Sequence, residues 1–568
     1  MKVKKLLSML LAIVMVVSLG ACSSTPDETS GGDASVTETG AETTDASTDK
    51  PVELTYMHKL FGDEKFVGND DINNNVWTRY YKEKLGIKLN YVVAAAGDDY
   101  TQKLTMAIAS DDLPDIMDLP PEEFKELADA GLLYDLSDLY DKYASDLLKQ
   151  SLEADGGTQL TSAKVDGKLY GFPQPAASDS TVDMIWVRSD WLKNLGLSAP
   201  TTMDELIKVA RAFKNDDPDG NGVDDTWGIG FQNKICDKDG ASPGSFEGFF
   251  AAYGSYSKAW LRGQDGTIQY SGIENGIKDA LIQLNTIYKE GLIDPEFGVK
   301  DTTKLSEDIA SGKVGLFYGT EGIPWGCAKS SIENNPKADW VSLPIVSATD
   351  KPAVAPMYVR ITRYFAVNKN CKNPEAIFKI ANVFQEKINS IDSDEETLNT
   401  FGVDPATGAN LAAYAAIGLD PAIQKCNTYY SEIKSVFDGK STVDQIHPEA
   451  ARYYKVMKEY IDSGYDKTNS LGWNYYKFIG PEGSWNTIIN DYKANNRTTE
   501  SLFFGAPTAT MSTSLASLDK LQSETYVNII MGTQGPDTFD KFVTDWKTLG
   551  GDQITKEVNE WHKTTFGN

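Results

Sequence analysis

The residues best suited to metal chemistry form an acidic loop at 217–225, with the sequence Asp-Pro-Asp-Gly-Asn-Gly-Val-Asp-Asp. Oxygen-bearing side chains stand at positions 1, 3, 5 and 9, and Gly222 at position 6 allows the sharp turn of an EF-hand calcium loop. Hard oxygen ligands in a tight loop suit Ca²⁺ better than zinc, so we predict a structural calcium site. The predicted ligands are Asp217, Asp219, Asn221 and Asp225, with Val223 contributing its backbone carbonyl. Gly228 occupies position 12 instead of the usual glutamate, and a solvated Asp/Gly-rich turn is the alternative interpretation.

Aromatic residues make up 11% of the chain, with 27 Tyr and 11 Trp, and form the second group with clear binding chemistry. Sugars have apolar ring faces and a rim of hydroxyls, so proteins stack Trp or Tyr on the rings and place polar groups at the rim. Trp325 is the first choice because it follows a predicted strand in a Gly-rich loop, and Trp473 lies in a predicted polar loop. The aromatic candidates are Trp325, Trp473, Trp186 and Trp77. For each of them a place in the core is the alternative.

Polar side chains near the predicted cleft segments complete the candidate binding site. A carboxylate together with an arginine can bracket sugar hydroxyls with charge-assisted hydrogen bonds. The polar candidates are Asp179, Glu321, Arg360 and Asn474. For Arg360 and for Arg363 the alternative is a salt bridge at a hinge.

The overall charge argues against several classes of function. Asp and Glu total 82 against 54 Lys and Arg, which gives a net charge of -28. Such a surface repels phosphate backbones, so we expect no nucleic-acid partner, and it favours a neutral ligand over a polyanion. The histidines His58, His447 and His562 are far apart, and neither HExxH nor GxxxxGK[ST] occurs. We therefore predict a protein that is not an enzyme, while a glycoside hydrolase with two catalytic carboxylates stays open as the alternative.

The N-terminus has the layout of a bacterial secretion signal. Three lysines within the first five residues precede an apolar run over 6–19, which is too short for a comfortable membrane span. The run ends in Leu19-Gly20-Ala21-Cys22, which looks like a lipobox, so we predict that residues 1–21 are removed and that Cys22 is lipidated with palmitate. An ordinary signal peptide with an incidental cysteine is the alternative. The Ser/Thr/Gly-rich segment 22–50 predicts a disordered tether on the extracellular face of the cell membrane.

The elements that must position these residues alternate between strand and helix. We predict strand 53–56, helix 75–85, strand 87–93, helix 100–110 and strand 113–117. This β-α-β-α-β order is typical of an α/β fold with a largely parallel sheet. A chain of 568 residues exceeds the roughly 250 that one domain usually holds, so two or more lobes are expected.

Several short motifs occur in a fixed order from about residue 110 onward. They are Leu113-Pro114-Asp115-Ile116, DGKLYGFP at 166–173, VRSDWL at 187–192, GLIDP at 291–295, GKVGLF at 312–317, RYFAVN at 363–368 and the segment 540–551. Together they resemble the extracellular solute-binding proteins of the carbohydrate-binding group that feed ABC importers. Within that group the resemblance is to the large lipoprotein branch that includes alginate-type oligosaccharide binders. That branch has an acidic residue at position 10 of a similar calcium loop, where this chain has Thr226.

The resemblance implies a two-lobed, periplasmic-binding-protein-like fold of type II, with the ligand in a cleft between lobes joined by hinge strands. Ligand contact with both lobes would then shift an equilibrium between open and closed forms. Lobe 1 is expected to hold 51–175 plus 360–428, and lobe 2 is expected to hold 176–357 plus 430–568.

The resemblance also implies a function. The expected protein is a lipid-anchored, monomeric substrate-binding protein that captures an oligosaccharide and delivers it to the permease subunits of an ABC transporter. Capture of a non-sugar solute such as a peptide is the remaining alternative within the binding class.

Overall fold

The computed structural model describes residues 50–60, 62, 64–174, 178–236, 243–359, 361–419 and 422–567. At its N-terminal end the predicted β-α-β-α-β order is confirmed, with β1 (Val52–Lys59), α1 (Val76–Leu85), β2 (Ile87–Ala95), α2 (Gly97–Ser110) and β3 (Ile116–Leu119). β1 pairs in parallel with both β2 and β3. The Asn75 side chain caps α1 by accepting two backbone N–H groups, and Gly86 ends the helix with a φ of 64°.

This first sheet is mixed, whereas the sequence predicts a largely parallel one. β13 (Tyr364–Val367) lies between β3 and β6 (Gly171–Pro173) and pairs antiparallel with both. The strand order is β2-β1-β3-β13-β6. A segment that connects this sheet to the rest of the chain follows β6, and another precedes β13. Both connections therefore join the sheet at its antiparallel half.

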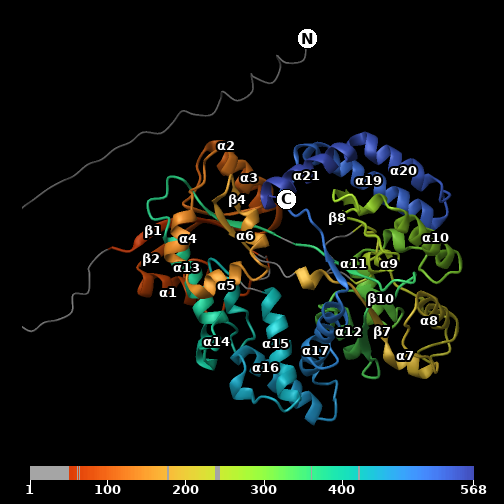
Figure 1. Ribbon diagram of the computed structural model, residues 1–568. Helices are drawn as coiled ribbons and strands as arrows, with labels where there is room; N and C mark the ends of the chain where they lie inside the picture. The colour runs from red at the N-terminus through yellow and green to blue at the C-terminus, as the bar shows by residue number, and fades with distance from the viewer. Residues whose placement is uncertain are drawn as a thin grey trace, which may run out of the picture. The chain divides into compact units, whose positions relative to one another are not determined.

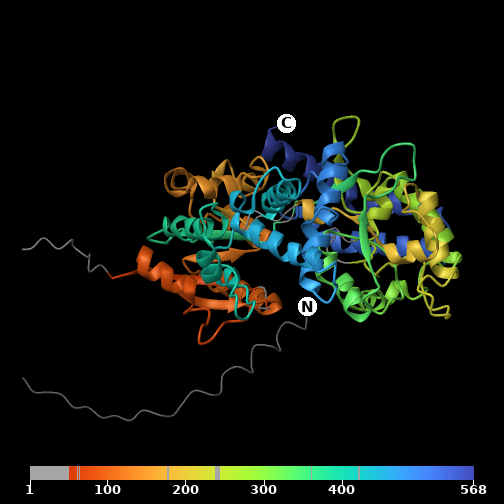
Figure 2. The ribbon, with the colours of Figure 1, turned by 90° about the horizontal axis from the view of Figure 1, so that it is seen from below.

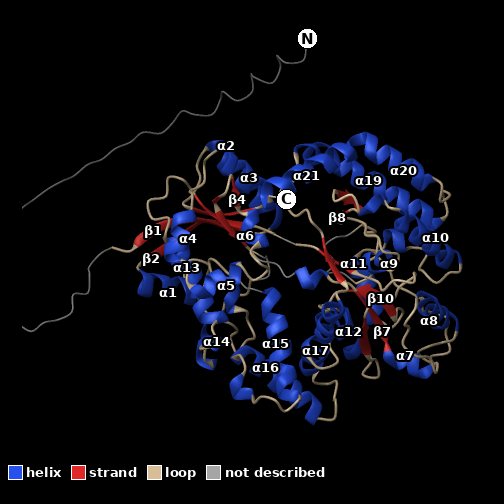
Figure 3. Cartoon of the chain, in the orientation of Figure 1, coloured by secondary structure: helices blue, strands red, loops and turns tan. Residues whose placement is uncertain are grey.

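A second sheet is built on β7 (Met184–Arg188), which lies between β10 (Leu316–Gly319) and β11 (Trp340–Leu343) and pairs antiparallel with both. A two-stranded ribbon, β12 (Ala355–Met357) with β14 (Thr498–Glu500), completes the strands that matter for the site. Helices surround the strands of both sheets (Figure 3). The remaining short strands are β4 (Lys164–Val165), β5 (Lys168–Leu169), β8 (Trp260–Arg262) and β9 (Ile268–Tyr270).

The helices fall into two groups, one with each sheet, and many helices of the second group pack on one another. Those around the first sheet also include α3 (Pro121–Asp129), α4 (Ser137–Tyr143), α5 (Asp146–Leu152), α6 (Thr158–Ser162), α13 (Ala376–Phe384) and α14 (Glu395–Phe401). The others are α7 (Ser189–Asn194), α8 (Met203–Asn215), α9 (Glu247–Ala251), α10 (Asn275–Lys289), α11 (Thr302–Ala310), α12 (Cys327–Asn334), α15 (Ala422–Phe437), α16 (Pro448–Asp462), α17 (Ser470–Ile479), α18 (Ser484–Asn486), α19 (Ala509–Met531), α20 (Thr538–Trp546) and α21 (Asp552–Phe566). α19 packs against α10 and α20 (Figure 1), and the C-terminal end of α21 lies at the side of the second group that faces the orange helices of the first (Figure 2). Within the described ranges no helix combines the length and the apolar character needed to cross a membrane.

Two separate hydrophobic cores give the protein two lobes. One core contains residues from Leu54 to Leu419 around the first sheet, and the other contains residues from Val182 to Val558 around the second. Core membership changes between Phe172 and Val182, again between Tyr358 and Tyr364, and a third time after Leu419. The chain therefore passes between the cores in three places. We call the first two of these the crossing segments, of which the structure describes 173–174, 178–181, 359 and 361–363.

Candidate ligand-binding site

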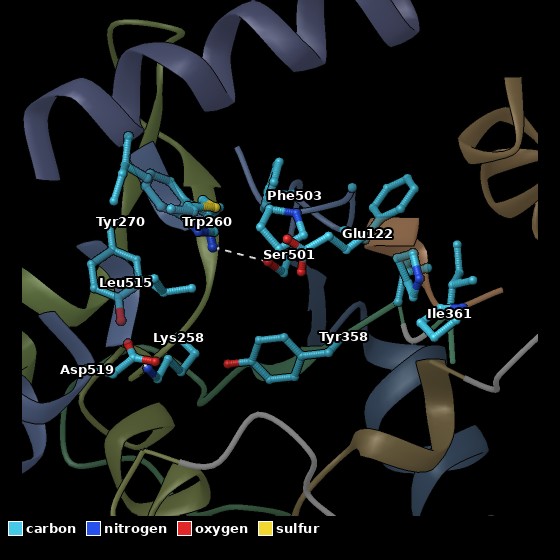
Figure 4. A pocket seen from close by; sticks show the side chains of 18 of the residues that line it. Glu122, Lys258, Trp260, Tyr270, Tyr358, Ile361, Ser501, Phe503, Leu515 and Asp519 are labelled. Atoms are coloured by element: carbon cyan, nitrogen blue, oxygen red, sulfur yellow. Dashed lines mark hydrogen bonds and ion pairs between the residues drawn. The ribbon is translucent and has the colours of Figure 1, made fainter. Parts of the chain in front are cut away.

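A cavity of about 680 Å³ lies where the N-terminus of α3 faces residues of the other lobe. Its first wall is Pro120–Glu123, directly after β3, and the second crossing segment contributes Ile361 and Thr362. Figure 4 shows Glu122 on one side of the cavity, with Lys258, Trp260 and Tyr270 on the other. The lining of the other lobe includes Cys236, Lys258, Trp260, Tyr270, Tyr358, Ser501, Phe503, Phe504, Met511, Leu515, Asp519 and Trp546. This cavity is hereafter the aromatic pocket.

Three rings at the back of the pocket hold one another in place. Tyr270 stacks on Trp546 with ring centroids 4.8 Å apart and an interplanar angle of 4°, and Trp260 tilts against Tyr270 at 5.1 Å. The Tyr270 hydroxyl lies 2.8 Å from the Ser257 carbonyl oxygen and 2.7 Å from Oε1 of Gln522, both of which are acceptors. The hydroxyl is directed into the protein, so Tyr270 lines the pocket with its aromatic ring.

Tyr358 is anchored in the same way. Its hydroxyl donates to Oε1 of Glu247 at 2.6 Å, and Oε2 of Glu247 accepts from the Ser257 hydroxyl at 2.6 Å. Burial raises the pKa of Glu247, while the hydrogen bonds from Ser257 and Tyr358 favour its charged form. Rigid aromatic rings with satisfied hydroxyls are suited to stacking on apolar ring faces of a ligand.

The charged groups of the pocket are mostly acidic. Lys258 forms an ion pair with Asp519, and α3 adds Glu122, which is exposed, and Glu123, which is half-buried. Three carboxylates therefore accompany one ammonium group. A pocket with this balance disfavours an anionic ligand and leaves carboxylate acceptors for hydroxyl groups.

Most of the sequence-predicted candidates gather elsewhere in the second lobe, around the turn after β10. Trp325 is 40% exposed and makes edge-to-face contacts with Tyr475 at 4.9 Å and Phe478 at 5.7 Å. Trp186 lies beneath this turn and donates from Nε1 to the Thr320 carbonyl oxygen at 3.0 Å. Trp325 is the only one of the four candidate tryptophans with a substantial exposed surface.

The acidic candidates Glu321 and Asp179 are close enough to interact. Glu321 is half-buried, and its Oε2 atom has no hydrogen-bond donor among the described residues. Burial raises the pKa of Glu321 to about 8, and the charge of Asp179 adds to this effect. Asp179 itself is buried and accepts from Lys493 at 2.8 Å and from the Asn427 side chain at 3.0 Å.

The other tryptophan candidates are fully buried, which favours packing roles for them. Trp77 lies in the core of the first lobe and donates from Nε1 to the Leu411 carbonyl oxygen at 2.8 Å. Trp186 and Trp473 have no exposed surface, and Asn474 is 1% exposed. The predicted loop around Trp473 is wrong, because this residue lies inside α17. Arg360 and Cys22 lie outside the described residues.

The side chains of the acidic loop converge around Asn221. Its Nδ2 atom lies 3.0 Å from Oδ2 of Asp219 and 3.4 Å from Oδ1 of Asp225, and Asp217 accepts the N–H groups of Asn221 and Gly222. Burial and the neighbouring carboxylates of Asp217 and Asp225 raise the pKa of Asp219. The donor set fits Ca²⁺ in kind, although no group of three or more His, Cys, Asp or Glu side chains with metal-holding geometry occurs in the described part of the chain.

The end of the loop is shaped by packing on α8. Thr226 is buried, and its hydroxyl donates to the Phe213 carbonyl oxygen at 2.6 Å, so it is directed away from the loop. A Cβ atom on Gly228 would lie 2.6 Å from the Ala210 carbonyl oxygen. Glutamate therefore cannot occupy position 12 without displacing the helix, and the candidate oxygen ligands of the loop all lie within its first nine positions.

Sequence reasoning missed the aromatic pocket. Its tryptophans carry no local signal, because Trp260 and Trp546 are 6% and 3% exposed and look like ordinary core residues. Trp546 meets Tyr270 only after folding, since the two residues are far apart in the chain. A signal was present only for the α3 wall, where Pro120 and Pro121 come shortly after the predicted buried strand 113–117.

The chain matches a known family of bacterial proteins over more than half of its length. The model of the bacterial extracellular solute-binding protein family matches residues 67–387, which is more than half of the chain. The chain belongs to this family. The resemblance expected from the motifs is thus confirmed, and so is the two-lobed α/β fold.

Individual relatives agree with the family. Lipoprotein LipO of Bacillus subtilis is 24% identical over 480 residues, covering 82% of this chain and 84% of LipO. The fructooligosaccharide ABC transporter substrate-binding protein FusA of Streptococcus pneumoniae is 31% identical over 260 residues, covering 44% and 47% of the two chains. Among solved structures, the FusA EF-hand mutant in complex with fructo-nystose has a TM-score of 0.56 at 19% identity, over 91% of this solute-binding protein and 100% of FusA.

Proposed function

We propose that this solute-binding protein captures an uncharged oligosaccharide in the aromatic pocket and delivers it to an ABC importer. The observation that carries the proposal is the set of anchored rings, Tyr270 and Tyr358, whose hydroxyls bind buried acceptors. The excess of carboxylates in the pocket argues for a neutral sugar over a uronate. The relatives named for sugar transport support the same ligand class.

The proposal is tested by calorimetry with the mature protein and matched neutral and uronic-acid oligosaccharides of several lengths. We expect binding of a neutral oligosaccharide and its recovery intact, with no new reducing ends after prolonged incubation. New reducing ends would support the hydrolase alternative. Binding of peptides alone, or of uronates in preference to neutral sugars, would contradict the proposal.

We further propose that the exposed Trp325 provides a second stacking surface, separate from the aromatic pocket. Its ring is supported by Tyr475 and Phe478, and Tyr475 in turn stacks on Tyr453 at 4.5 Å. Carboxylates of Glu321 and Asp179 lie near the same turn. A ligand longer than a disaccharide is consistent with two aromatic surfaces on one lobe.

Calcium binding at 217–225 is part of the proposal. The support is the type and convergence of the oxygen donors, together with the solved structure of an EF-hand mutant of FusA. When bound, Ca²⁺ would be held by Asp217, Asp219, Asn221 and Asp225 and by the Val223 carbonyl. It would tie the loop to the end of α8 and would play no part in ligand contact.

We also propose that the mature protein begins at Cys22, is lipid-anchored at the extracellular face of the membrane and acts as a monomer. The lipobox-like sequence and the lipoprotein relative support this. The tether 22–50 would join the anchor to lobes of 51–175 plus 360–428 and 176–357 plus 430–568. Fractionation of cells that produce Cys22→Ala is the test, since retention in the membrane fraction after a high-salt wash would contradict the anchor.

A further inference from the structure

A buried charged cluster lies at the carboxyl ends of β1 and β3, where no ligand contact has been assigned. Oδ2 of Asp118 accepts from Nη1 of Arg363 at 2.8 Å, from the Lys59 N–H at 2.9 Å, and lies 2.9 Å from Nδ1 of His58. Oδ1 of Asp118 accepts from the Tyr56 hydroxyl at 2.5 Å. Asp118 has no exposed surface, and His58 and Arg363 are each 4% exposed. Burial opposes ionisation of Asp118, but His58 and Arg363 overcome it and lower its pKa.

Arg363 extends this cluster to both crossing segments. It belongs to the second crossing segment itself, and its Nε atom donates to Oε1 of Gln174 in the first. The backbone N–H of Gln174 donates back to the Arg363 carbonyl oxygen at 2.9 Å. Nη1 of Arg363 also donates to the Lys59 carbonyl oxygen at the end of β1. A single guanidinium group therefore joins the two crossing segments to two strand ends of the first lobe.

The same cluster borders the aromatic pocket on two sides. Asp118 stands two residues before Pro120, where the α3 wall of the pocket begins. Arg363 directly follows Ile361 and Thr362, which line the pocket from the second crossing segment. Neither Asp118 nor Arg363 lines the pocket, so any influence on the ligand must act through these neighbours.

We infer that Arg363, held by Asp118, is a positioning residue that fixes the two crossing segments against the first lobe and thereby sets the relative placement of the pocket walls. The inference rests on the proposed capture function only for its effect on affinity. Its effect on the distribution of lobe separations can be measured without any ligand. The planar guanidinium group has several donors in a fixed fork, so it can bind Asp118, Gln174 and the Lys59 carbonyl together. A lysine ammonium group lacks this arrangement of donors.

Two variants test whether the bridge made by Arg363 can be removed while the protein stays folded. Arg363→Lys keeps a positive charge next to Asp118 but removes the simultaneous contact with Gln174. Gln174→Met removes the acceptor of Arg363 Nε and leaves the Asp118–Arg363 ion pair intact. The matched control is Arg188→Lys, because Arg188 is also buried and forks onto Asp190 at 2.6 and 2.7 Å, but lies at the end of β7 in the other lobe, outside both crossing segments.

The ligand-free measurement is a spin-label distance distribution between the two lobes. Labels are carried by an unnatural amino acid at Met106 on α2 and Leu549 after α20, which are 71% and 61% exposed. We expect broader distributions for Arg363→Lys and Gln174→Met, each with a melting temperature within a few degrees of wild type, and an unchanged distribution for Arg188→Lys. Unchanged distributions in both crossing variants, or equal broadening in the control, would overturn the inference.

The second measurement is affinity for the neutral oligosaccharide that wild type binds most tightly in the calorimetric screen. We expect at least a threefold loss in both crossing variants and less than a twofold change in Arg188→Lys. If the wild type binds no oligosaccharide, the proposed function fails while the distance measurement still decides the inference. Equal affinity in all variants despite broadened distances would overturn the claim that Arg363 positions the pocket.

Discussion

The hydroxyl of Tyr358 donates a 2.6 Å hydrogen bond to the buried carboxylate of Glu247, directly behind the aromatic pocket. Glu247 also accepts from the Ser257 N–H, and Ser257 provides the carbonyl oxygen beside the Tyr270 hydroxyl. One buried acid thus connects the supports of two pocket rings. Because buried polar groups need satisfied partners, this arrangement fixes the ring positions before any ligand arrives and lowers the entropy lost on binding.

The pocket interpretation predicts a selective effect of Phe503→Ala. Phe503 is half-buried, lines the pocket and packs edge-to-face on Trp561 at 4.9 Å. Loss of a central aromatic contact typically costs about 2 kcal/mol of binding, so affinity for the neutral oligosaccharide should fall by at least roughly tenfold in calorimetry.

Phe566→Ala provides the matched control for Phe503. Phe566 is also half-buried and packs on the same Trp561 at 5.8 Å, but it does not line the pocket. It should lower the melting temperature by a similar amount and leave affinity unchanged. Equal losses of affinity in the two variants would show that packing around Trp561, and not the pocket, controls binding.

Much of the fold could be predicted because its signals are local. The β-α-β-α-β start follows from alternation and helical spacing within short windows, and the caps at Asn75 and Gly86 stand where the pattern changes. The predicted loop at Trp473 failed for a physical reason. Gly472 lies in the predicted loop, but a Cβ there would lie 2.5 Å from the Tyr460 Cβ, so the glycine permits close packing of α17 on α16.

The candidate site could be predicted only in part, because its parts meet through topology. The motif around Trp325 gave an exposed aromatic residue, which the structure places beside Tyr475. The pocket rings instead come from segments hundreds of residues apart, such as Tyr270 and Trp546. No spacing rule in one sequence links these positions, and their burial gives them the composition of a core.

The exposed surface of Trp325 predicts a second effect on affinity. Trp325→Ala should weaken binding of a long neutral oligosaccharide by at least about tenfold, while shorter ones that fill only the aromatic pocket should bind as before. Stability should change little, because the ring is 40% exposed. Calorimetry with a ladder of chain lengths and a thermal melt check both points.

The buried Trp473 supplies the contrast for Trp325. It has no exposed surface, so Trp473→Ala should lower stability by roughly 3–5 kcal/mol through the cavity that it leaves. A large loss of stability in Trp325→Ala, or unaltered affinity at every chain length, would place Trp325 among the structural residues.

Removal of calcium should lower the stability of the protein, and this loss should depend on the acidic loop. A ligand of the folded state stabilises by mass action, so addition of EDTA should lower the melting temperature and excess Ca²⁺ should restore it. Asp219→Asn should abolish most of this dependence, because Asp219 is one of the carboxylates that converge around Asn221.

Asp224→Asn is the control for the calcium loop. Asp224 lies in the same loop, but its carboxylate is 76% exposed and forms an ion pair with Lys214 at 2.6 Å. This variant should keep the response to EDTA. Melting curves that are identical with and without EDTA, together with no calcium in elemental analysis, would refute the site.

The raised pKa of Glu321 leads us to expect that the free energy of unfolding depends on pH. Burial raises its pKa in the folded protein to about 8, whereas an unfolded chain has a value near 4.5. The folded state therefore holds the proton more tightly, and the stabilisation is fully present below about pH 4.5 and is lost as pH rises through about 8. Since Glu321 is half-buried, we expect this contribution to be on the order of a few kcal/mol at most.

Glu321→Gln should remove this contribution, because the amide is neutral at every pH and keeps the size of the side chain. The free energy of unfolding, measured in urea at steps from pH 5 to 9, should fall less steeply with pH in the variant than in wild type. Glu333→Gln on α12 is the control, since Glu333 is exposed, and its curve should run parallel to wild type. Parallel curves for Glu321→Gln and wild type would mean that the carboxyl beside Asp179 is solvated and titrates in the same way in both states.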